Sequence, residues 1–317
     1  MTLKAAVFCH NGLGDGINCI VLSQHLHLNG FSVDTFQNTI GPLQNWFPHL
    51  PVFPYPTIDS LEHILKSYNY YFVVWNDSSE FVQKLIQEGK KRFPDRIKVI
   101  YLYPSPNIIR EPYYADCLTN PKMPVAENMR IISREVLKLP LFTYDSPLKA
   151  PNHLTKRLYS NRIVIHPTSA KPNRNWDKEK FIRLALSLKD QGYEITFIPG
   201  TNDLANWKEM EQEKIKVVDF SNVESLAEYL YESGYFIGND SGPGHLASSL
   251  HLPTVTICRR KALADLWAPS FYKNYPVVPS SLIPNIRGLR LRDKYWQKFI
   301  SVSKVLRAFN DLKTEVS

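Results

Sequence analysis

Short apolar runs alternate with helical patterns along almost the whole chain, and this alternation limits the possible folds more than any other feature. In the second half, the apolar runs 162–166 and 194–198 flank an amphipathic helical pattern over 177–191. Short strands separated by longer helices are typical of a parallel sheet that is covered on both faces. The sequence therefore predicts an α/β protein built on parallel sheets.

The alternation runs through the chain twice, with a Pro-containing stretch at 140–151 between the two passes. A chain of 317 residues is longer than one hydrophobic core usually serves. We therefore predict two Rossmann-like domains, residues 1–150 and 151–317, whose parallel sheets face a central cleft. The amphipathic segment 294–312 is expected to form a final helix, which could pack back on the first domain.

Three loops are expected at the carboxyl ends of the strands, where open α/β sheets bind ligands: 10–16, 167–176 and 239–245. Each of them follows an apolar run and precedes a helical pattern. Region 104–124 differs, because it is rich in proline and shows no regular pattern. We expect it to cover an acceptor site as a mobile loop.

The segment 234–250 is the most informative of these stretches, since it reads as a strand, a tight polar turn and a helix. Pro243 suits the first helical turn, where its missing N–H costs nothing. Gly242 and Gly244 would let a ligand approach the backbone closely. Free amides at the start of a helix attract phosphate, so this turn is a candidate anion site.

Three side chains of this turn allow two interpretations. Asp240, Ser241 and His245 could contact a ligand held at the helix start. In the alternative, Asp240 or Ser241 only caps the helix, and His245 is a buried core residue. The two glycines and the proline crowded between Asp240 and His245 favour a ligand near the backbone.

Composition narrows the class of protein. The sequence has no apolar run of membrane-spanning length and no signal peptide, which indicates a cytoplasmic protein. Cys9, Cys19, Cys117 and Cys258 lack metal-site spacing and are interpreted as reduced thiols. The net charge of +8 suits an acidic ligand. Basic clusters such as 259–261 are interpreted as solvated faces, and no nucleic-acid partner is expected.

The motifs together resemble glycosyltransferase family 9, the lipopolysaccharide heptosyltransferase-like enzymes. The sequence Asp-Ser-Gly-Pro-Gly-His-Leu at 240–246 looks like the family pattern of Asp-Ser/Thr-Gly, two residues and His-Leu. Four further segments are similar to other motifs of the family, and they occur along the chain in the same order as in the family: 12–15, 166–169, 174–181 and 267–269.

The resemblance implies a GT-B fold and an inverting, metal-independent transfer of a sugar, with heptose the family's best-known case. The donor would be a nucleotide diphosphate sugar, and the acceptor a hydroxyl of a bacterial surface glycan such as lipopolysaccharide core. The first domain would bind the acceptor and the second the donor. Asp15, next to Gly14, matches the family's proposed base. The same carboxylate could cap the helix, and both roles can hold at once.

The resemblance also implies a donor site in the second domain. Arg174 stands where the family has a lysine that neutralises the diphosphate, with Lys171 as a nearby substitute. Asp203 is expected at the donor ribose, with Glu209 as the fallback. No cofactor and no metal are expected, because no Asp-x-Asp motif occurs. The expected donor-binding residues are Gly14, Thr168, Ser169, Lys171, Arg174, Asp203, Asp240, Ser241, Gly242 and His245.

Two other functions remain open from the sequence. One is a nucleotide-sugar epimerase or hydrolase with the same two-domain plan, which would work without an acceptor. The other is a non-catalytic nucleotide-sugar binder, in which Asp15 is only a helix cap. For the transferase we expect a cytoplasmic location, with a glycan or glycolipid acceptor met at the inner face of the membrane.

Overall fold

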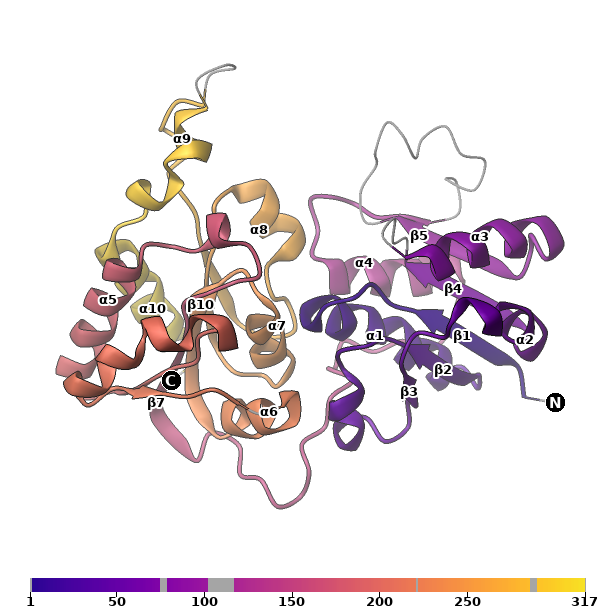
Figure 1. Cartoon of the computed structure of the whole chain (residues 1–317), viewed down its shortest axis with the longest axis horizontal. Helices are drawn as coiled ribbons and strands as arrows, with labels where there is room; N and C mark the ends of the chain where they lie inside the picture. Colours follow the sequence, from indigo (N-terminus) through magenta and orange to yellow (C-terminus); the bar gives the residue numbers. More distant parts are fainter. Residues whose placement is uncertain (1, 75–78, 102–116, 221, 286–289, 317) are drawn as a thin grey trace. The chain divides into compact units, whose positions relative to one another are not determined.

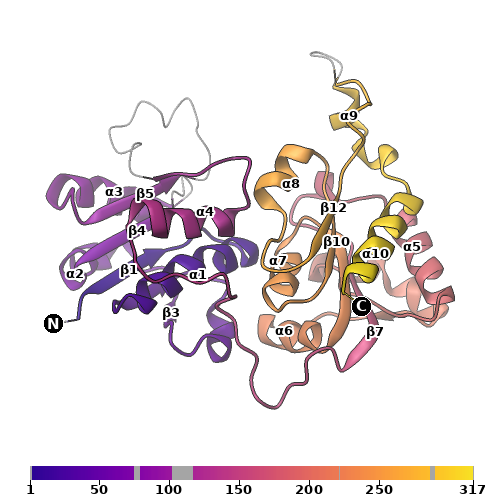
Figure 2. The same ribbon diagram turned by 180° about the vertical axis from the view of Figure 1, so that it is seen from behind.

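The computed structural model describes residues 2–74, 79–101, 117–220, 222–285 and 290–316. It divides into two compact units, Met1–Lys149 and Ala150–Ser317. Figures 1 and 2 show the ribbon from opposite sides, with the first unit in indigo to magenta. Most of the region 104–124, for which we expected a mobile loop, falls outside the described residues.

The first unit is built on a parallel sheet whose described strands have the order β3-β2-β1-β4-β5-β6. The strand pairs among its described residues are parallel. Its elements are β1 (Lys4–Phe8), α1 (Leu13–Leu28), β2 (Ser32–Phe36), β3 (Val52–Phe53), α2 (Leu61–Ser67), β4 (Tyr70–Val74), α3 (Glu80–Arg92), β5 (Ile97–Tyr101), β6 (Cys117–Leu118) and α4 (Val125–Ile131).

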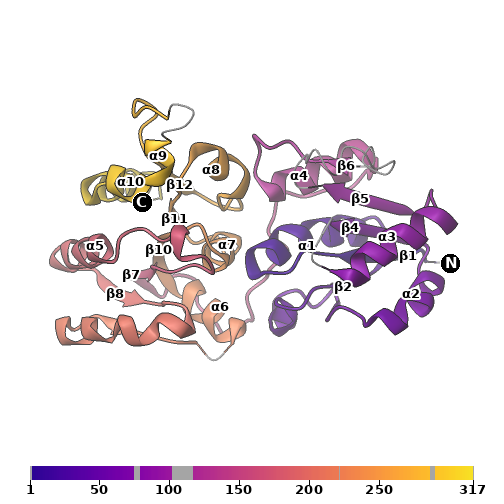
Figure 3. The ribbon, with the colours of Figure 1, turned by 45° about the horizontal axis from the view of Figure 1, so that its top comes forward.

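Helices cover both faces of this first sheet. α2 and α3 lie together on one face, and α1 and α4 on the other (Figure 3). Leu65 of α2 and Leu85 of α3 share a buried cluster with Phe8 and Tyr71 of the sheet. The central strands are apolar on both sides, as a sheet between two helical layers requires.

The second unit repeats the plan, with described strands in the order β12-β11-β10-β7-β8-β9. Numbered within each unit, both sheets follow the doubly wound order 3-2-1-4-5-6. Its elements are β7 (Tyr159–His166), α5 (Lys178–Asp190), β8 (Glu194–Phe197), β9 (Lys216–Val217), α6 (Val223–Tyr231), β10 (Ser233–Asn239), α7 (Gly242–Ser249), β11 (Thr254–Ile257), α8 (Lys261–Trp267), β12 (Asn274–Val277), α9 (Leu291–Lys294) and α10 (Val302–Val316). The predicted α/β class with parallel sheets is thereby confirmed.

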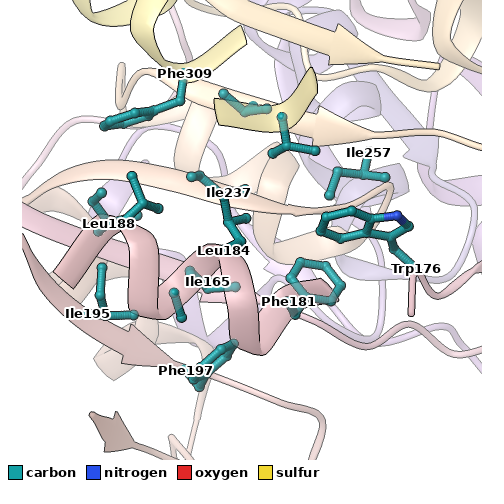
Figure 4. Packing of buried hydrophobic residues seen from close by; sticks show 14 of the residues in the cluster. Ile165, Trp176, Phe181, Leu184, Leu188, Ile195, Phe197, Ile237, Ile257 and Phe309 are labelled. Atoms are coloured by element: carbon teal, nitrogen blue, oxygen red, sulfur yellow. The ribbon is translucent and has the colours of Figure 1, made fainter. Parts of the chain in front are cut away.

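One hydrophobic core of the second unit lies between its sheet and the helices α5 and α10. Figure 4 shows Leu184 and Leu188 of α5 beneath Ile237 of the sheet, with Phe309 of α10 above. Helices α6, α7 and α8 cover the opposite face (Figures 2 and 3). Both faces of β7 and β10 are therefore buried.

Some expected elements differ in the structure. The final helix begins at Val302 rather than at 294, and it buries Phe309 in the core of the second unit. Between β8 and β9 the chain forms the 3-10 turns Thr201–Asn206 and Lys208–Glu213. The short edge strands β3, β6 and β12 and the helix α8 were not predicted.

Candidate functional site

The candidate site of the second unit lies at the carboxyl edge of its sheet. The register pairs Gly238 of β10 with His166 of β7, and Asn239 of β10 with Ile257 of β11, so these strands end at one level. α5 follows β7 and α7 follows β10, and the two helices cover opposite faces of the sheet (Figure 3). Open α/β sheets bind ligands where neighbouring strands send their helices to opposite sides.

Asp240 and Ser241 connect β10 to α7, and the helix begins at Gly242, within the segment 239–245 that the sequence predicted as a loop. Ser241 precedes the helix in extended conformation (φ −161°, ψ 162°), and its hydroxyl donates to Asn239 O at 3.1 Å. Because that hydroxyl does not cap α7, the alternative reading of Ser241 as a side-chain cap is wrong. The amides of Gly244 and His245 bond to Ser241 O and Pro243 has no N–H, so an anion at this helix start would meet the helix dipole and the amide of Gly242.

Two glycines allow this turn to lie close against its neighbours. A Cβ atom on Gly238 would lie 2.8 Å from His166 O, which would force β10 away from β7. A Cβ atom on Gly244 would lie 3.3 Å from Cε1 of Phe236, which is also tight. The close packing of β10 and α7 against their neighbours thus depends on a glycine in each of the two elements.

The loop 167–176 is tied to β10 at both ends by one buried side chain. Asn239 is fully buried, and its Nδ2 donates to Pro167 O at 2.7 Å. Its Oδ1 accepts from the amide of Trp176 at 3.0 Å. Asn239 thus fixes the loop that carries Thr168, and sequence reasoning had not singled it out.

Thr168 and Asp203 are neighbours in the structure. The Oγ1 atom of Thr168 accepts from the amide of Gly200 at 2.7 Å, which links the loop to the turn after β8. A Cβ atom on Gly200 would lie 3.4 Å from that oxygen and 3.8 Å from Oδ2 of Asp203. The fallback residue, Glu209, forms a 2.7 Å ion pair with Lys178. The geometry therefore favours Asp203.

Lys171 and Arg174 are exposed on the same loop, and Arg174 ends the 3-10 turn Pro172–Arg174. They bring two positive charges to the carboxyl edge of the sheet. The hydroxyl of Ser169 lies 2.9 Å from Lys171 O and 2.7 Å from Oδ1 of Asn175. A ligand contact by Ser169 would have to replace one of these bonds.

The C-terminal segment braces this loop from the other side. The indole N–H of Trp296 donates to Asn173 O at 3.3 Å. The indole N–H of Trp176 donates to Ile300 O at 3.1 Å. Both indoles are almost fully buried, and Trp176 contacts Phe181 of α5 edge to face (Figure 4). The loop is therefore fixed between β10 and the segment before α10.

The two histidines of the motifs are buried. His166 Nδ1 lies 2.5 Å from Ile198 O, and burial lowers the pKa of His166 to about 4. Burial likewise lowers the pKa of His245 to about 4, and its ring is hydrogen-bonded to the backbone of Trp267. Both rings are thus neutral at pH 7. This geometry favours the alternative reading of His245 as a structural residue.

In the first unit the candidate base lies in the first turn of α1. Gly12 precedes the helix with φ 118°, a value that favours glycine, so Asp15 is the third helical residue and not the N-cap. Its carboxylate folds back over the turn, because a Cβ atom on Gly12 would lie 2.6 Å from Oδ2 of Asp15. His10 Nδ1 lies 3.7 Å from the same oxygen, and the Asp15 side chain is 26% exposed.

Another buried carboxamide holds this loop. Gln37 Nε2 donates to Gly12 O at 2.9 Å, and Gln37 Oε1 accepts from the amide of Ile40 at 2.8 Å. Gly16 leaves room for it, since a Cβ atom there would lie 2.9 Å from Cδ of Gln37. Like Asn239, Gln37 was not predicted. The sequence signal that could have identified both residues is an Asn or Gln at the end of a buried strand or directly after it.

The described residues contain neither a membrane-spanning helix nor a cluster of metal-binding side chains. None of the helices in this part of the chain is long and apolar enough to cross a membrane. Within the same residues, no three His, Cys, Asp or Glu side chains are grouped so that they could hold a metal ion.

Residues 136–262 match the family model of glycosyltransferase family 9 (heptosyltransferase). The matched segment contains the loop 167–176 and the turn 240–245, whereas Asp15 lies outside it. The predicted family resemblance is thus confirmed for this part of the chain.

Known proteins agree with this match. Lipopolysaccharide heptosyltransferase 1 of Campylobacter coli is 28% identical over 128 residues, which is 37% of each chain. The chain thus aligns with little more than a third of this curated relative. A glycosyl transferase family 9 structure from Veillonella parvula has a TM-score of 0.69 at 17% identity, and the match covers 99% of this chain and 98% of the Veillonella chain. The E. coli heptosyltransferase WaaC with ADP has a TM-score of 0.66 at 13% identity, and the match covers 98% of this chain and 100% of the WaaC chain. These structures share the fold, which confirms the predicted GT-B type.

Proposed function

Because residues 136–262 match the family model of glycosyltransferase family 9, we propose that this chain transfers a sugar from a nucleoside diphosphate sugar to a hydroxyl of a bacterial surface glycan. Heptose carried by ADP is the donor that we infer, since the WaaC structure of the same fold was solved with ADP. Lipopolysaccharide core is the inferred acceptor, met by a cytoplasmic enzyme at the inner face of the membrane.

The observation that carries the proposal is the position of the family motifs at one edge of the second sheet. The loop 167–176 brings Thr168, Lys171 and Arg174 to this edge, and the turn after β10 brings the uncapped start of α7. Basic side chains and a helix start are the groups that bind a diphosphate. A donor-binding second unit accounts for both.

The transfer needs a base and a stabilised leaving group. The acceptor oxygen attacks the anomeric carbon, and its proton passes to the carboxylate of Asp15. The bond from that carbon to the diphosphate breaks, and its electron pair leaves with the diphosphate. Arg174 and the start of α7 stabilise the negative charge that develops there. Asp203, beside Thr168, is assigned to the donor ribose.

The first test is ligand binding by the full chain. We expect one nucleoside diphosphate among ADP, GDP, UDP and CDP to raise the melting temperature by a few degrees at 100 times its Kd, where binding adds about 2.7 kcal/mol. Arg174→Gln should reduce this shift. Lys214→Gln, which removes an exposed charge in the turn just before β9, should leave the shift unchanged. No shift with any of the four nucleotides would refute the donor site.

The second test separates a transferase from the alternatives. Asp15→Asn should keep nucleotide affinity and lose sugar transfer roughly 100-fold or more, because it removes the base. Asp95→Asn, an exposed carboxylate of the same unit, is the matched control. An epimerase or hydrolase would instead turn over the nucleotide sugar without acceptor, and a binding protein would show no turnover in either form.

A further inference from the structure

Arg259 lies at the same edge of the second sheet as the proposed donor site. It follows β11 by two residues, and β11 is the direct neighbour of β10. The amide of Asp240 donates to Ile257 O at 3.2 Å, so the chain leaving β11 runs beside the turn 240–245. The sequence alone had placed Arg259 in a solvated basic cluster, whereas the structure makes it half-buried.

The three basic residues of that cluster have different surroundings. Arg260 forms a 3.7 Å ion pair with Asp293 of α9, and Lys261 forms a 2.6 Å ion pair with Asp265 one turn along α8. Arg259 forms no such ion pair among the described residues, and this is what sets it apart, since the Nε atoms of both Arg259 and Arg260 are buried there without a hydrogen bond. A half-buried guanidinium group whose charge has no ion-pair partner favours binding of an anion.

Electrostatics at Arg259 point the same way. Burial lowers its pKa, and the positive charges of Arg260 and Arg174 lower it further, while Asp293 and Asp240 act in the opposite direction. Arg174 of the loop after β7 is therefore close enough to repel Arg259. Two arginines from different loops thus concentrate positive charge around the turn that carries Asp240.

We propose that Arg259 binds the diphosphate of the donor together with Arg174, as a second guanidinium group on the opposite side of the turn 240–245. This assignment rests on the proposed function, because it takes the ligand to be a nucleoside diphosphate sugar.

The assignment gives Arg259 a defined chemical task. A guanidinium group presents a planar fork of donors that fits two phosphate oxygens at once. Arg174 and Arg259 would neutralise the diphosphate from two sides and hold it against the start of α7. The negative charge grows on these oxygens as the sugar leaves, so the two arginines stabilise the departing group as well as the bound donor.

The test compares nucleotides that differ only in phosphate number. We would measure the Kd of ADP and of AMP for the full chain by calorimetry, in the wild type and in Arg259→Gln. A charge-assisted bond to phosphate is worth on the order of 10-fold to 100-fold in affinity. Arg259→Gln should weaken ADP by that factor and AMP much less. Arg259→Lys should weaken ADP less than Arg259→Gln, because it keeps the charge and loses the fork.

Lys261→Gln is the matched control, since it removes one positive charge two residues away at a side chain that is 78% exposed. It should change the Kd of ADP less than about 2-fold, as expected for a surface charge. Equal ADP affinity in Arg259→Gln and the wild type would overturn the assignment and leave the donor site intact. Wild-type protein that binds no nucleoside diphosphate would refute the proposed function and the assignment with it. The melting temperature of each unliganded variant shows whether it is folded.

Discussion

Both candidate loops are held by carboxamide side chains that lie behind them. Gln37 fixes the loop before α1, and Asn239 fixes the loop before α5. A carboxamide suits this position because it donates and accepts at once, so one uncharged residue satisfies two backbone groups. Each loop is thereby fixed by an uncharged side chain that lies behind it.

Replacing Asn239 by Ala should destabilise the protein by about 2–4 kcal/mol, because it leaves Pro167 O and the amide of Trp176 buried and unpaired. Urea unfolding measures this change, and ADP affinity should fall with it as the loop loosens. Asn161→Ala, an exposed asparagine at the start of β7, should stay within about 0.5 kcal/mol of the wild type. Similar values for the two variants would contradict the proposed role of Asn239.

At the residue scale, the sequence predicted where the motif residues lie in the fold better than it predicted what their side chains do. Pro243 lies in the first turn of α7 as expected, because its fixed φ and missing N–H suit only that place. His245 and Asp15 could not be resolved in this way. Whether an imidazole faces a ligand or a backbone carbonyl depends on residues such as Trp267, which are remote in the sequence.

Elements with a clear apolar or amphipathic pattern were the ones that the sequence predicted well. The apolar run Tyr235–Ile237 of β10 and the amphipathic pattern of α5 leave little choice of structure. The edge strands β3 and β6 were missed, because two paired residues give no periodic signal. The start of α10 was also predicted too early, since Trp296 and Phe299 repeat the helical spacing within a 3-10 turn.

The helix α10 is expected to contribute strongly to the second unit, because Val305, Phe309 and Leu312 are fully buried in its core. Phe309→Ala should lower the free energy of unfolding by about 3–5 kcal/mol through lost burial and a residual cavity. Asn310→Ala, on the exposed side of the same helix, controls for helix propensity. If the two variants unfold at the same urea concentration, α10 does not belong to this core in solution.

At the scale of the whole molecule, each unit carries its own sheet of the same strand order and its own core. This plan was predictable, because periodicity and length depend on many residues and tolerate local errors. The placing of histidines inside these cores was not. His25 of the first unit and His166 and His245 of the second all have pKa values lowered by burial.

Stability should therefore fall as the pH falls. The folded chain keeps His166 and His245 neutral down to about pH 4, whereas the unfolded chain binds protons at these residues below about pH 6.5. Between pH 7 and pH 5 the two groups together should lower the free energy of unfolding by about 4 kcal/mol, with the loss complete near the folded pKa. Urea unfolding at both pH values measures this, and His245→Asn should roughly halve the slope. Equal stability of the wild type at both pH values would refute the assignment of these neutral histidines.

The brace between the donor loop and the C-terminal segment also sets an order of events during synthesis. Trp176 and its partner Ile300 are 124 residues apart in the chain. At a translation rate of about 5–20 residues per second, roughly 6–25 seconds pass between the synthesis of the two. During that interval the strands β8 to β12 are synthesised, and the loop stays unbraced until the segment around Ile300 follows them. The ability to hold a donor should therefore arise late, once this segment has left the ribosome.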